Sequence, residues 1–144
     1  MTGASVHQGF DDFDEEDSAE AQARRALHRR VVWERVELIR AGNWAPSRNP
    51  DDYLPEDAWK ALASCAALPV DAMFPERGED QRAIRALCGL CPVAEECLSY
   101  AVDAAIKFGV WGGASERRRR VLRHLRGDRD DLAKDTGLPE EPAA

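Results

Sequence analysis

Cysteine spacing constrains this chain more than any other feature of its sequence. Cys88, Cys91 and Cys97 fall within ten residues, and Cys65 lies 23 positions before Cys88. Four thiolates can complete a coordination sphere around zinc or an iron–sulfur cluster. A Cys-x-x-Cys turn can aim two sulfurs at one centre, and Cys97 can join them from the first turn of a following helix. The spacing therefore predicts a metal or cluster site.

Composition predicts a cytoplasmic protein with one small domain. A chain of 144 residues has room for one modest core plus tails. No run approaches the ~18 apolar residues of a membrane helix, and the acidic start of the chain is unlike a secretory signal. We therefore expect reduced cysteines, which favours metal ligation over a framework of structural disulfides.

Charge is divided into blocks that the net charge of −7 conceals. Residues 1–20 carry seven acids and no Lys or Arg, and residues 127–144 carry six acids against two bases. Between them, residues 21–49 carry seven Arg against two Glu, and residues 116–126 carry six Arg against one Glu. The total argues against a uniformly basic nucleic-acid binder, but the second basic block remains a candidate DNA contact.

The expected fold class is all-α, a small bundle of short helices around the four cysteines, because no convincing period-2 strand appears. The expected organisation is a disordered acidic arm (1–17), a helical extension with a Pro-rich linker (18–55), a cysteine-containing domain (56–113), a basic helix (114–127) and a disordered acidic tail (128–144). A region of about 55 residues buries little apolar surface, so we expect metal binding to be coupled to its folding.

Helix signals divide the chain further. Ser18 is expected to cap a helix that ends near Arg40, before Gly42, and that is mostly a solvated amphipathic helix separated by the linker from the functional region. Shorter helices are expected over 56–64 and 80–87. A further helix after Pro92 is expected to place Cys97, Ala101, Ala104 and Phe108 on one face.

The last expected helix, 116–126, begins after Ser115 and is closed by Gly127. Arg119, Arg123 and Arg126 are spaced to share one positive, outward face suited to DNA phosphates or guanine edges. A neighbouring apolar stripe is expected to dock on the domain; it consists of Val121, Leu122 and Leu125.

A glycine-rich turn, GVWGG at 109–113, precedes this helix. Glycines permit positive φ in such a turn, and Trp111 between them has little local cover. An aromatic side chain presented in this way is a good anchor for a protein interface. The turn therefore predicts a partner-binding surface.

Taken together, Cys-x22-Cys-x2-Cys-x5-Cys followed by Gly-Val-Trp-Gly-Gly resembles the WhiB-like family of actinobacterial transcriptional regulators, over about residues 59–126. The resemblance includes CPVAEECL, the Phe74–Pro75 pair and the basic helix behind the turn. It implies a non-enzymatic, redox- or nitric-oxide-responsive regulator with one 4Fe–4S cluster per chain. It also implies two partners, region 4 of the primary sigma factor and promoter DNA.

The resemblance assigns roles to particular residues. The implied cluster ligands are Cys65, Cys88, Cys91 and Cys97. The implied sigma-factor surface consists of Trp59, Phe74, Pro75, Trp111, Gly112 and Gly113. The implied DNA contacts are Arg117, Arg118, Arg119, Arg120, Arg123 and Arg126. The chain departs from the family pattern at Met73, where a second aromatic is common, and it has no Gly-Arg-Pro hook after the basic helix.

Two other chemistries fit the cysteines. Zinc could staple a protein–protein adaptor, although structural zinc sites usually show two short Cys/His knuckles and Cys65 stands alone here. Cys88-Gly-Leu-Cys91 could also exchange disulfides in a cluster-free form, but thiol–disulfide enzymes usually place this motif at the end of a strand. No strand is expected there.

Overall fold

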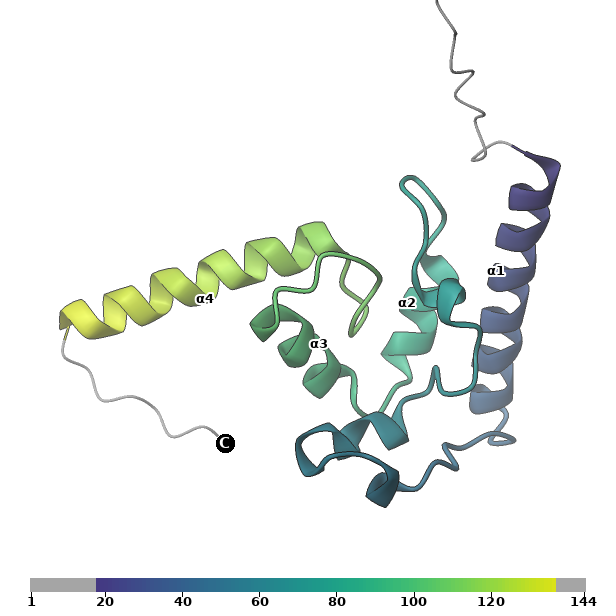
Figure 1. The fold of residues 1–144 in the computed structure, drawn as a ribbon, viewed down its shortest axis with the longest axis horizontal. Helices are drawn as coiled ribbons and strands as arrows, with labels where there is room; N and C mark the ends of the chain where they lie inside the picture. Colours follow the sequence, from purple (N-terminus) through teal and green to yellow (C-terminus); the bar gives the residue numbers. More distant parts are fainter. Residues whose placement is uncertain (1–17, 137–144) are drawn as a thin grey trace, which may run out of the picture.

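In the computed structural model, residues 18–136 are described, and their regular structure is helical (Figure 1). The elements in order are α1 (Ala19–Arg40), the short 3-10 helices η2 (Pro50–Asp52), η3 (Pro55–Leu62) and η4 (Val70–Met73), then α2 (Arg82–Gly89), α3 (Ala94–Asp103) and α4 (Glu116–Thr136). Within 18–136 the only extended pairing is an isolated bridge between Trp111 and Ala114. The all-α prediction is confirmed. The acidic arm expected at 1–17 lies outside the described residues, as do residues 137–144.

The predicted boundaries of the first helix are confirmed. The Ser18 side chain accepts a hydrogen bond from the backbone N–H of Ala21 at 3.1 Å, and this satisfies one of the free donors of the first turn. At the other end, Gly42 takes a φ of +72, a left-handed conformation that glycine adopts without steric cost. None of the described helices is long and apolar enough to cross a membrane.

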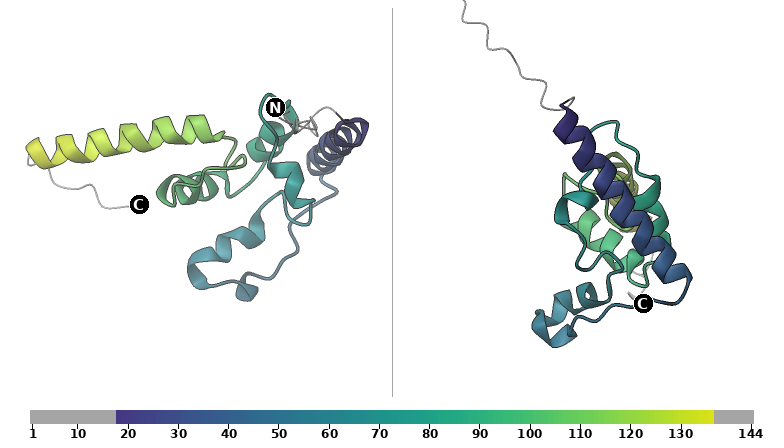
Figure 2. Two further views of the ribbon diagram at one scale, coloured as in Figure 1. Left: turned by 45° about the horizontal axis from the view of Figure 1, so that its top comes forward. Right: turned by 90° about the vertical axis from the view of Figure 1, so that its right-hand side faces the viewer.

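Helix α1 packs against the domain that contains the cysteines, as both views of the ribbon show (Figures 1 and 2). Val32 and Val36 are fully buried with Leu87 of α2 and Ala72 of η4. The expectation of a solvated helix, set apart by a linker, is therefore wrong. The physical reason is the small size of the cysteine-containing region, which lacks enough apolar surface for a core of its own.

The elements around the cysteines follow the predicted order with shifted ends. The segment near 56–64 forms η3, and α2 begins at Arg82 and ends at Gly89. Helix α3 ends at Asp103, and Ala105 then turns the chain with a φ of 50. Phe108 consequently does not share the helix face of Cys97, and its side chain is 75% exposed. That part of the prediction is wrong.

Helix α4 does not stop at Gly127 but continues to Thr136, which corrects both its predicted end and the expected start of the tail. One glycine inside a helix costs only about 1 kcal/mol relative to alanine, so neighbouring helix-forming residues can carry the helix through it. Figure 1 shows α4 projecting away from the other helices, with only its first part beside α3.

The apolar stripe of α4 does not dock on the domain as expected. Val121 and Leu125 are 47% and 55% exposed. Arg119 instead turns inward and is 2% exposed. Leu122, the third residue of the stripe, is half-buried, so the base of α4 is attached mainly through a buried arginine and only in part through its aliphatic side chains.

Candidate metal centre and partner surface

The four cysteines come from four successive segments of the fold. Cys65 lies in the loop after η3, Cys88 in the last turn of α2, Cys91 in the following turn and Cys97 near the start of α3. All four are free thiols with partly buried side chains. When ionised, Cys65, Cys91 and Cys97 each disfavour a thiolate at Cys88, so the fold brings the predicted ligands into one neighbourhood.

Burial determines the acid–base behaviour of these thiols. It is the main cause that raises the pKa of Cys88 to about 12 and the pKa of Cys97 to about 11. Burial also raises the pKa of Cys65, and the charge of Cys91 adds to this effect. Because metals bind thiolates, loading this site must release protons from thiols that hold them tightly.

The GVWGG turn packs directly behind the cysteines. The backbone N–H groups of Gly112 and Gly113 face Cys97 and Cys88 respectively, and each favours the thiolate and offsets part of the rise in pKa. A Cβ added to Gly112 would lie 2.5 Å from the carbonyl oxygen of Ala94 and 2.7 Å from the Cβ of Leu98. Glycine is required here both by this close approach to α3 and by the φ of +56.

Arg119 closes the other side of the turn. Its Nη1 donates to the carbonyl oxygens of Gly109 at 2.8 Å and Ala114 at 2.6 Å. Its Nη2 donates to those of Ile106 at 2.9 Å and Phe108 at 3.2 Å. The spacing of charges along the helix indicated an outward-facing Arg119, and that expectation is wrong. The turn contains carbonyl groups without helical partners, and a guanidinium has enough donors to satisfy several of them.

This buried cation has no carboxylate ion pair among the described residues, and its Nε–H is buried without an acceptor there. The negative groups whose charges act on Arg119 are Glu116 and Cys97. A buried unpaired charge is costly, so a nearby anionic group would stabilise it. An iron–sulfur cluster bound through Cys97 fits this requirement.

A cavity of about 540 Å³ opens beside the same cysteines. Of the four cysteines only Cys88 and Cys91 line it, together with Gly112 and Gly113, and its charged lining residues are Arg85, Glu95 and Glu96. Zinc would draw each thiolate to about 2.3 Å from one ion. No group of three or more His, Cys, Asp or Glu within 18–136 is arranged to hold a single metal ion. Four thiols are a donor set that suits either zinc or an iron–sulfur cluster.

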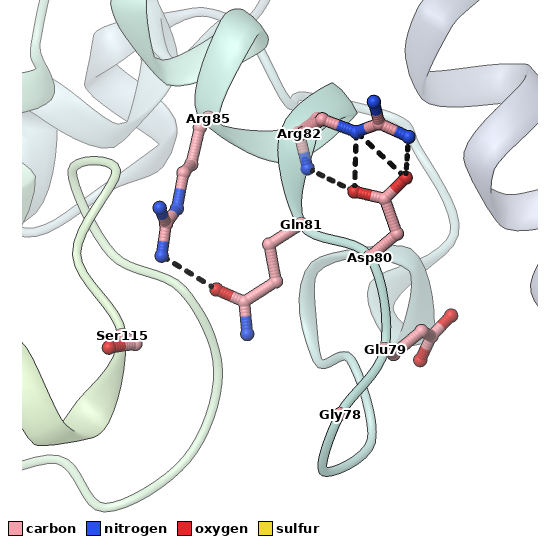
Figure 3. A pocket seen from close by; sticks show the side chains of 7 residues that line it. All are labelled: Gly78, Glu79, Asp80, Gln81, Arg82, Arg85 and Ser115. Carbon is pink, nitrogen blue, oxygen red and sulfur yellow. Dashed lines mark hydrogen bonds and ion pairs between the residues drawn. The ribbon is translucent and has the colours of Figure 1, made fainter.

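A second cleft, of about 440 Å³, lies between the start of α2 and the start of α4 (Figure 3). Asp80 pairs with Arg82 at 2.8 Å, and the pair holds the pKa of Asp80 at about 2, mainly through the hydrogen bond from the Arg82 side chain. Arg85 points into the space between Gln81 and Ser115 and donates to the Gln81 side chain at 3.4 Å. Arg85 thus borders both cavities.

Three aromatic rings contact one another in series, and a fourth lies near the last of them across Gly109; the four residues are here called the aromatic row: Trp59, Tyr100, Trp111 and Phe74. The ring centroids of Trp59 and Tyr100 are 5.7 Å apart, and those of Tyr100 and Trp111 are 5.8 Å apart. Phe74 and Trp111 flank Gly109, where an added Cβ would lie 2.8 Å from Phe74 Cε1 and 3.1 Å from Trp111 Nε1.

The structure therefore brings together the predicted aromatic residues and adds one that sequence reasoning missed. Tyr100 is 36% exposed and joins Trp59 to Trp111, but no sequence spacing relates a tyrosine on α3 to a tryptophan in η3. Pro75 directly follows Phe74 in the same loop. The backbone N–H of Val110 donates to the Met73 carbonyl at 3.0 Å, which fastens this loop to the GVWGG turn.

The remaining arginines predicted to contact DNA lie on the surface of α4. They are Arg117, Arg118, Arg120, Arg123 and Arg126. Arg120 lies 3.9 Å from Glu116, and Arg126 pairs with Asp103 of α3. Arg117, Arg118 and Arg123 are exposed, which gives the first half of the projecting helix a positive surface.

Comparison with known proteins agrees with this arrangement. The model of the family described as transcription factor WhiB matches residues 59–122. Transcriptional regulator WhiB2 of Mycobacterium tuberculosis is 42% identical over 79 residues, which cover 55% of this chain and 89% of that protein. Transcriptional regulator WhiB of Streptomyces coelicolor is 42% identical over 73 residues, covering 51% of this chain and 84% of that protein.

A third relative, transcriptional regulator WhiB4 of Mycobacterium tuberculosis, is 39% identical over 88 residues, covering 61% of this chain and 71% of that protein. The family match begins at Trp59, the first member of the aromatic row, and ends at Leu122 in α4. It includes all four cysteines, the GVWGG turn and Arg119, but it does not include α1.

Proposed function

The chain belongs to the WhiB family of transcriptional regulators, and we propose that it carries a 4Fe–4S cluster on Cys65, Cys88, Cys91 and Cys97. We propose further that the aromatic row binds region 4 of the primary sigma factor and that α4 contacts promoter DNA. The observation that carries the proposal is the position of the GVWGG turn. The N–H of Gly113 in this turn bonds to Cys88, and the side chain of Trp111 in the same turn belongs to the aromatic row.

The residues around the cysteines suit an anionic cluster. The N–H groups of Gly112 and Gly113 favour thiolates at Cys97 and Cys88, and the buried charge of Arg119 acts on Cys97. Such donors and charges stabilise a cluster and tune its potential. When bound, a 4Fe–4S cluster supplies a one-electron redox centre that oxygen and nitric oxide can attack.

The aromatic row has the character of a protein interface. Its side chains are large and partly exposed; Trp59, Tyr100 and Trp111 contact one another, and Phe74 lies near Trp111 across Gly109. Aromatic residues are enriched among the few residues that carry most of the binding energy of an interface. In this proposal Gly112 and Gly113 act from behind the row, because they shape the turn that presents Trp111.

The turn also connects the cluster site to this surface. Loss of the cluster would remove the anionic partner of Arg119, whose guanidinium holds four carbonyl groups of the segment 106–114. The same segment contains Trp111, whose Nε1 donates to the Phe108 carbonyl at 2.9 Å. We therefore propose that oxygen or nitric oxide changes sigma-factor affinity through this segment.

DNA contact is assigned to the exposed arginines of α4, without Arg119. The net charge of −7 makes strong unaided attraction to DNA unfavourable. The projecting position of α4 allows it to reach DNA while the aromatic row is bound to the sigma factor (Figure 1). We propose that this cytoplasmic regulator acts at promoters as part of the polymerase holoenzyme.

Anaerobic purification of the full chain with iron and acid-labile sulfide analysis, together with a binding assay for sigma region 4, tests the proposal. We expect four iron and four sulfide per chain and binding that is lost after exposure to nitric oxide. One zinc per chain without sulfide would instead support the zinc-stapled adaptor. The high pKa of Cys88 is opposite to the lowered pKa of reactive Cys-x-x-Cys thiols, so we do not favour a thiol–disulfide reductase.

A further inference from the structure

The guanidinium of Arg35, near the C-terminal end of α1, is bonded to the loop that carries Cys65. Its Nη1 donates to the carbonyl oxygen of Ser64 at 2.9 Å and to that of Ala66 at 2.7 Å. These residues directly precede and follow the cysteine. One nitrogen therefore holds both neighbours of a candidate ligand.

The Cys65 loop is held by packing, since Ser64 and Ala66 are buried and Cys65 contacts the core, but it has few other hydrogen bonds. It lies between η3 and η4, and its internal hydrogen bonds are turn contacts, from the N–H of Ala66 to the Ala63 carbonyl at 3.1 Å and from the N–H of Leu68 to the Cys65 carbonyl at 3.2 Å. Ala67 takes a φ of 62, a left-handed conformation that is strained for a residue with a Cβ. The two hydrogen bonds from Arg35 therefore add an anchor from outside the loop to the packing that keeps this shape.

Arg35 is well placed to be that anchor. Its guanidinium carbon lies 4.1 Å from the ring centroid of Trp44, so the ring covers the group. Among residues 18–136 no carboxylate forms an ion pair with it. The buried side chains of Val32 and Val36 hold the same stretch of α1 against α2. The donor is therefore rigidly positioned by packing on both sides.

We propose that Arg35 positions Cys65 for ligation, which makes α1 a working part of the metal centre. The inference rests on the proposed cluster, but it concerns a helix outside the family match at 59–122. Arg35 acts through the loop and is a positioning residue. Outer-shell partners of metal ligands typically change metal affinity by about 10–100-fold when they are replaced.

The extension also brings positive charge to this ligand. The Arg35 guanidinium is bonded to the residues on both sides of Cys65, so its charge lies next to this candidate ligand. Reduction adds negative charge to a cluster, and nearby cations stabilise the reduced form. Removal of the Arg35 charge should therefore shift the reduction potential to a more negative value.

The test compares Arg35→Met, Arg35→Lys and Arg30→Met in the full chain. Methionine keeps a long stem but removes the donors and the charge, whereas lysine keeps the charge but not the planar group that stacks on Trp44. Arg30 is the matched control, because it lies on the same helix and, within residues 18–136, its side chain bonds only to Glu34 in an exposed pair.

Three measurements follow the Cys65 loop. Hydrogen exchange is recorded for the peptide that spans residues 63–68, and iodoacetamide alkylation of Cys65 is compared with that of Cys97 in the metal-free protein. Iron release to a chelator is timed in the loaded protein. In Arg35→Met we expect faster exchange at 63–68, a rise in alkylation confined to Cys65, and iron release about tenfold faster or more.

Arg35→Lys should show the same selective changes at smaller size, and Arg30→Met should show none. Unchanged exchange and alkylation at the Cys65 loop in Arg35→Met would overturn the proposal. If Arg35→Met fails to fold, Arg35→Lys provides the test. Exchange and alkylation that are unchanged in Arg35→Lys, or that rise equally throughout the protein, would also overturn the proposal. Exchange and alkylation do not need a cluster, so they test Arg35 even if the wild-type protein lacks iron and sulfide, a result that would refute the proposed function instead.

Discussion

Arg119 donates to the carbonyl oxygen of Ala114 across 2.6 Å, and that same oxygen accepts the backbone N–H of Trp111 at 3.1 Å. Arg119, the buried arginine of α4, thus shares an acceptor with Trp111, the residue at the centre of the candidate interface. This arrangement joins the base of α4, the GVWGG turn and the neighbourhood of Cys97 in one buried unit.

The ligand assignment predicts that replacing any one of the four cysteines by Ser abolishes stable cluster binding. The fold of the region around them should also loosen, because the cluster replaces part of a small core. Visible absorption of anaerobic protein and urea denaturation measure the two effects. Ser99→Ala, on the exposed side of α3, is the control. Protein without colour, containing one zinc and no sulfide, would contradict the assignment.

Arg119→Met should destabilise the protein by at least about 2 kcal/mol, because carbonyl groups now bonded to the guanidinium lose their buried donor. Arg120→Met is the matched control, since Arg120 is exposed and lies 3.9 Å from its only ion-pair partner in the described chain, Glu116. A surface change of this kind is usually within about 0.5 kcal/mol. Equal denaturation midpoints for the two variants would show that the buried contacts of Arg119 contribute no net stability.

Trp111→Ala should weaken binding to sigma region 4 by ~2 kcal/mol, about thirtyfold, while the cluster remains. Titration of labelled region 4 and visible absorption on one preparation give both quantities. The control is Trp33→Ala, which removes a partly exposed tryptophan from α1, outside the aromatic row. Loss of both cluster and binding would make Trp111 a core residue, and loss of neither would remove support for the interface.

Replacing Arg117, Arg118 and Arg123 by Ala should flatten the plot of log affinity for promoter DNA against log salt by about 2.7 units. Each phosphate contact contributes a slope of about −0.9 through counterion release. The control removes three exposed arginines from α1 instead, namely Arg24, Arg30 and Arg40. An unchanged slope in the α4 variant would assign this helix to protein contacts.

The stability of the metal-free protein should fall as pH rises above 9.0, the ordinary pKa of the thiols. The fall should continue until the pH passes the folded pKa values, which are about 11 for Cys97 and about 12 for Cys88. The folded state binds these protons more tightly than the unfolded state. Its advantage is therefore complete below pH 9.0 and is lost as the folded thiols ionise. Urea denaturation across this range, with the double variant Cys88→Ser/Cys97→Ser as reference, isolates their contribution. Parallel curves would contradict it.

Much of the site could be predicted from local sequence. Cysteine spacing and the GVWGG turn identified the candidate ligands and the family, because both are short patterns with a direct chemical meaning. The start and end of α1 were also predictable, since Ser18 and Gly42 act on the backbone within one turn. That the cysteines bind a cluster and that Trp111 contacts the sigma factor both stay predictions.

The sequence by itself determined the helical class, the candidate ligands and the family. Only the tertiary structure decided that Arg119 points inward, that Tyr100 completes the aromatic row and that Arg35 reaches Cys65. Helical periodicity shows which residues share a face, but it does not show which face meets the domain. Which face packs inward depends on groups that are distant in sequence. Carbonyl groups without partners and apolar side chains of a small core come next to these helices only when the chain folds.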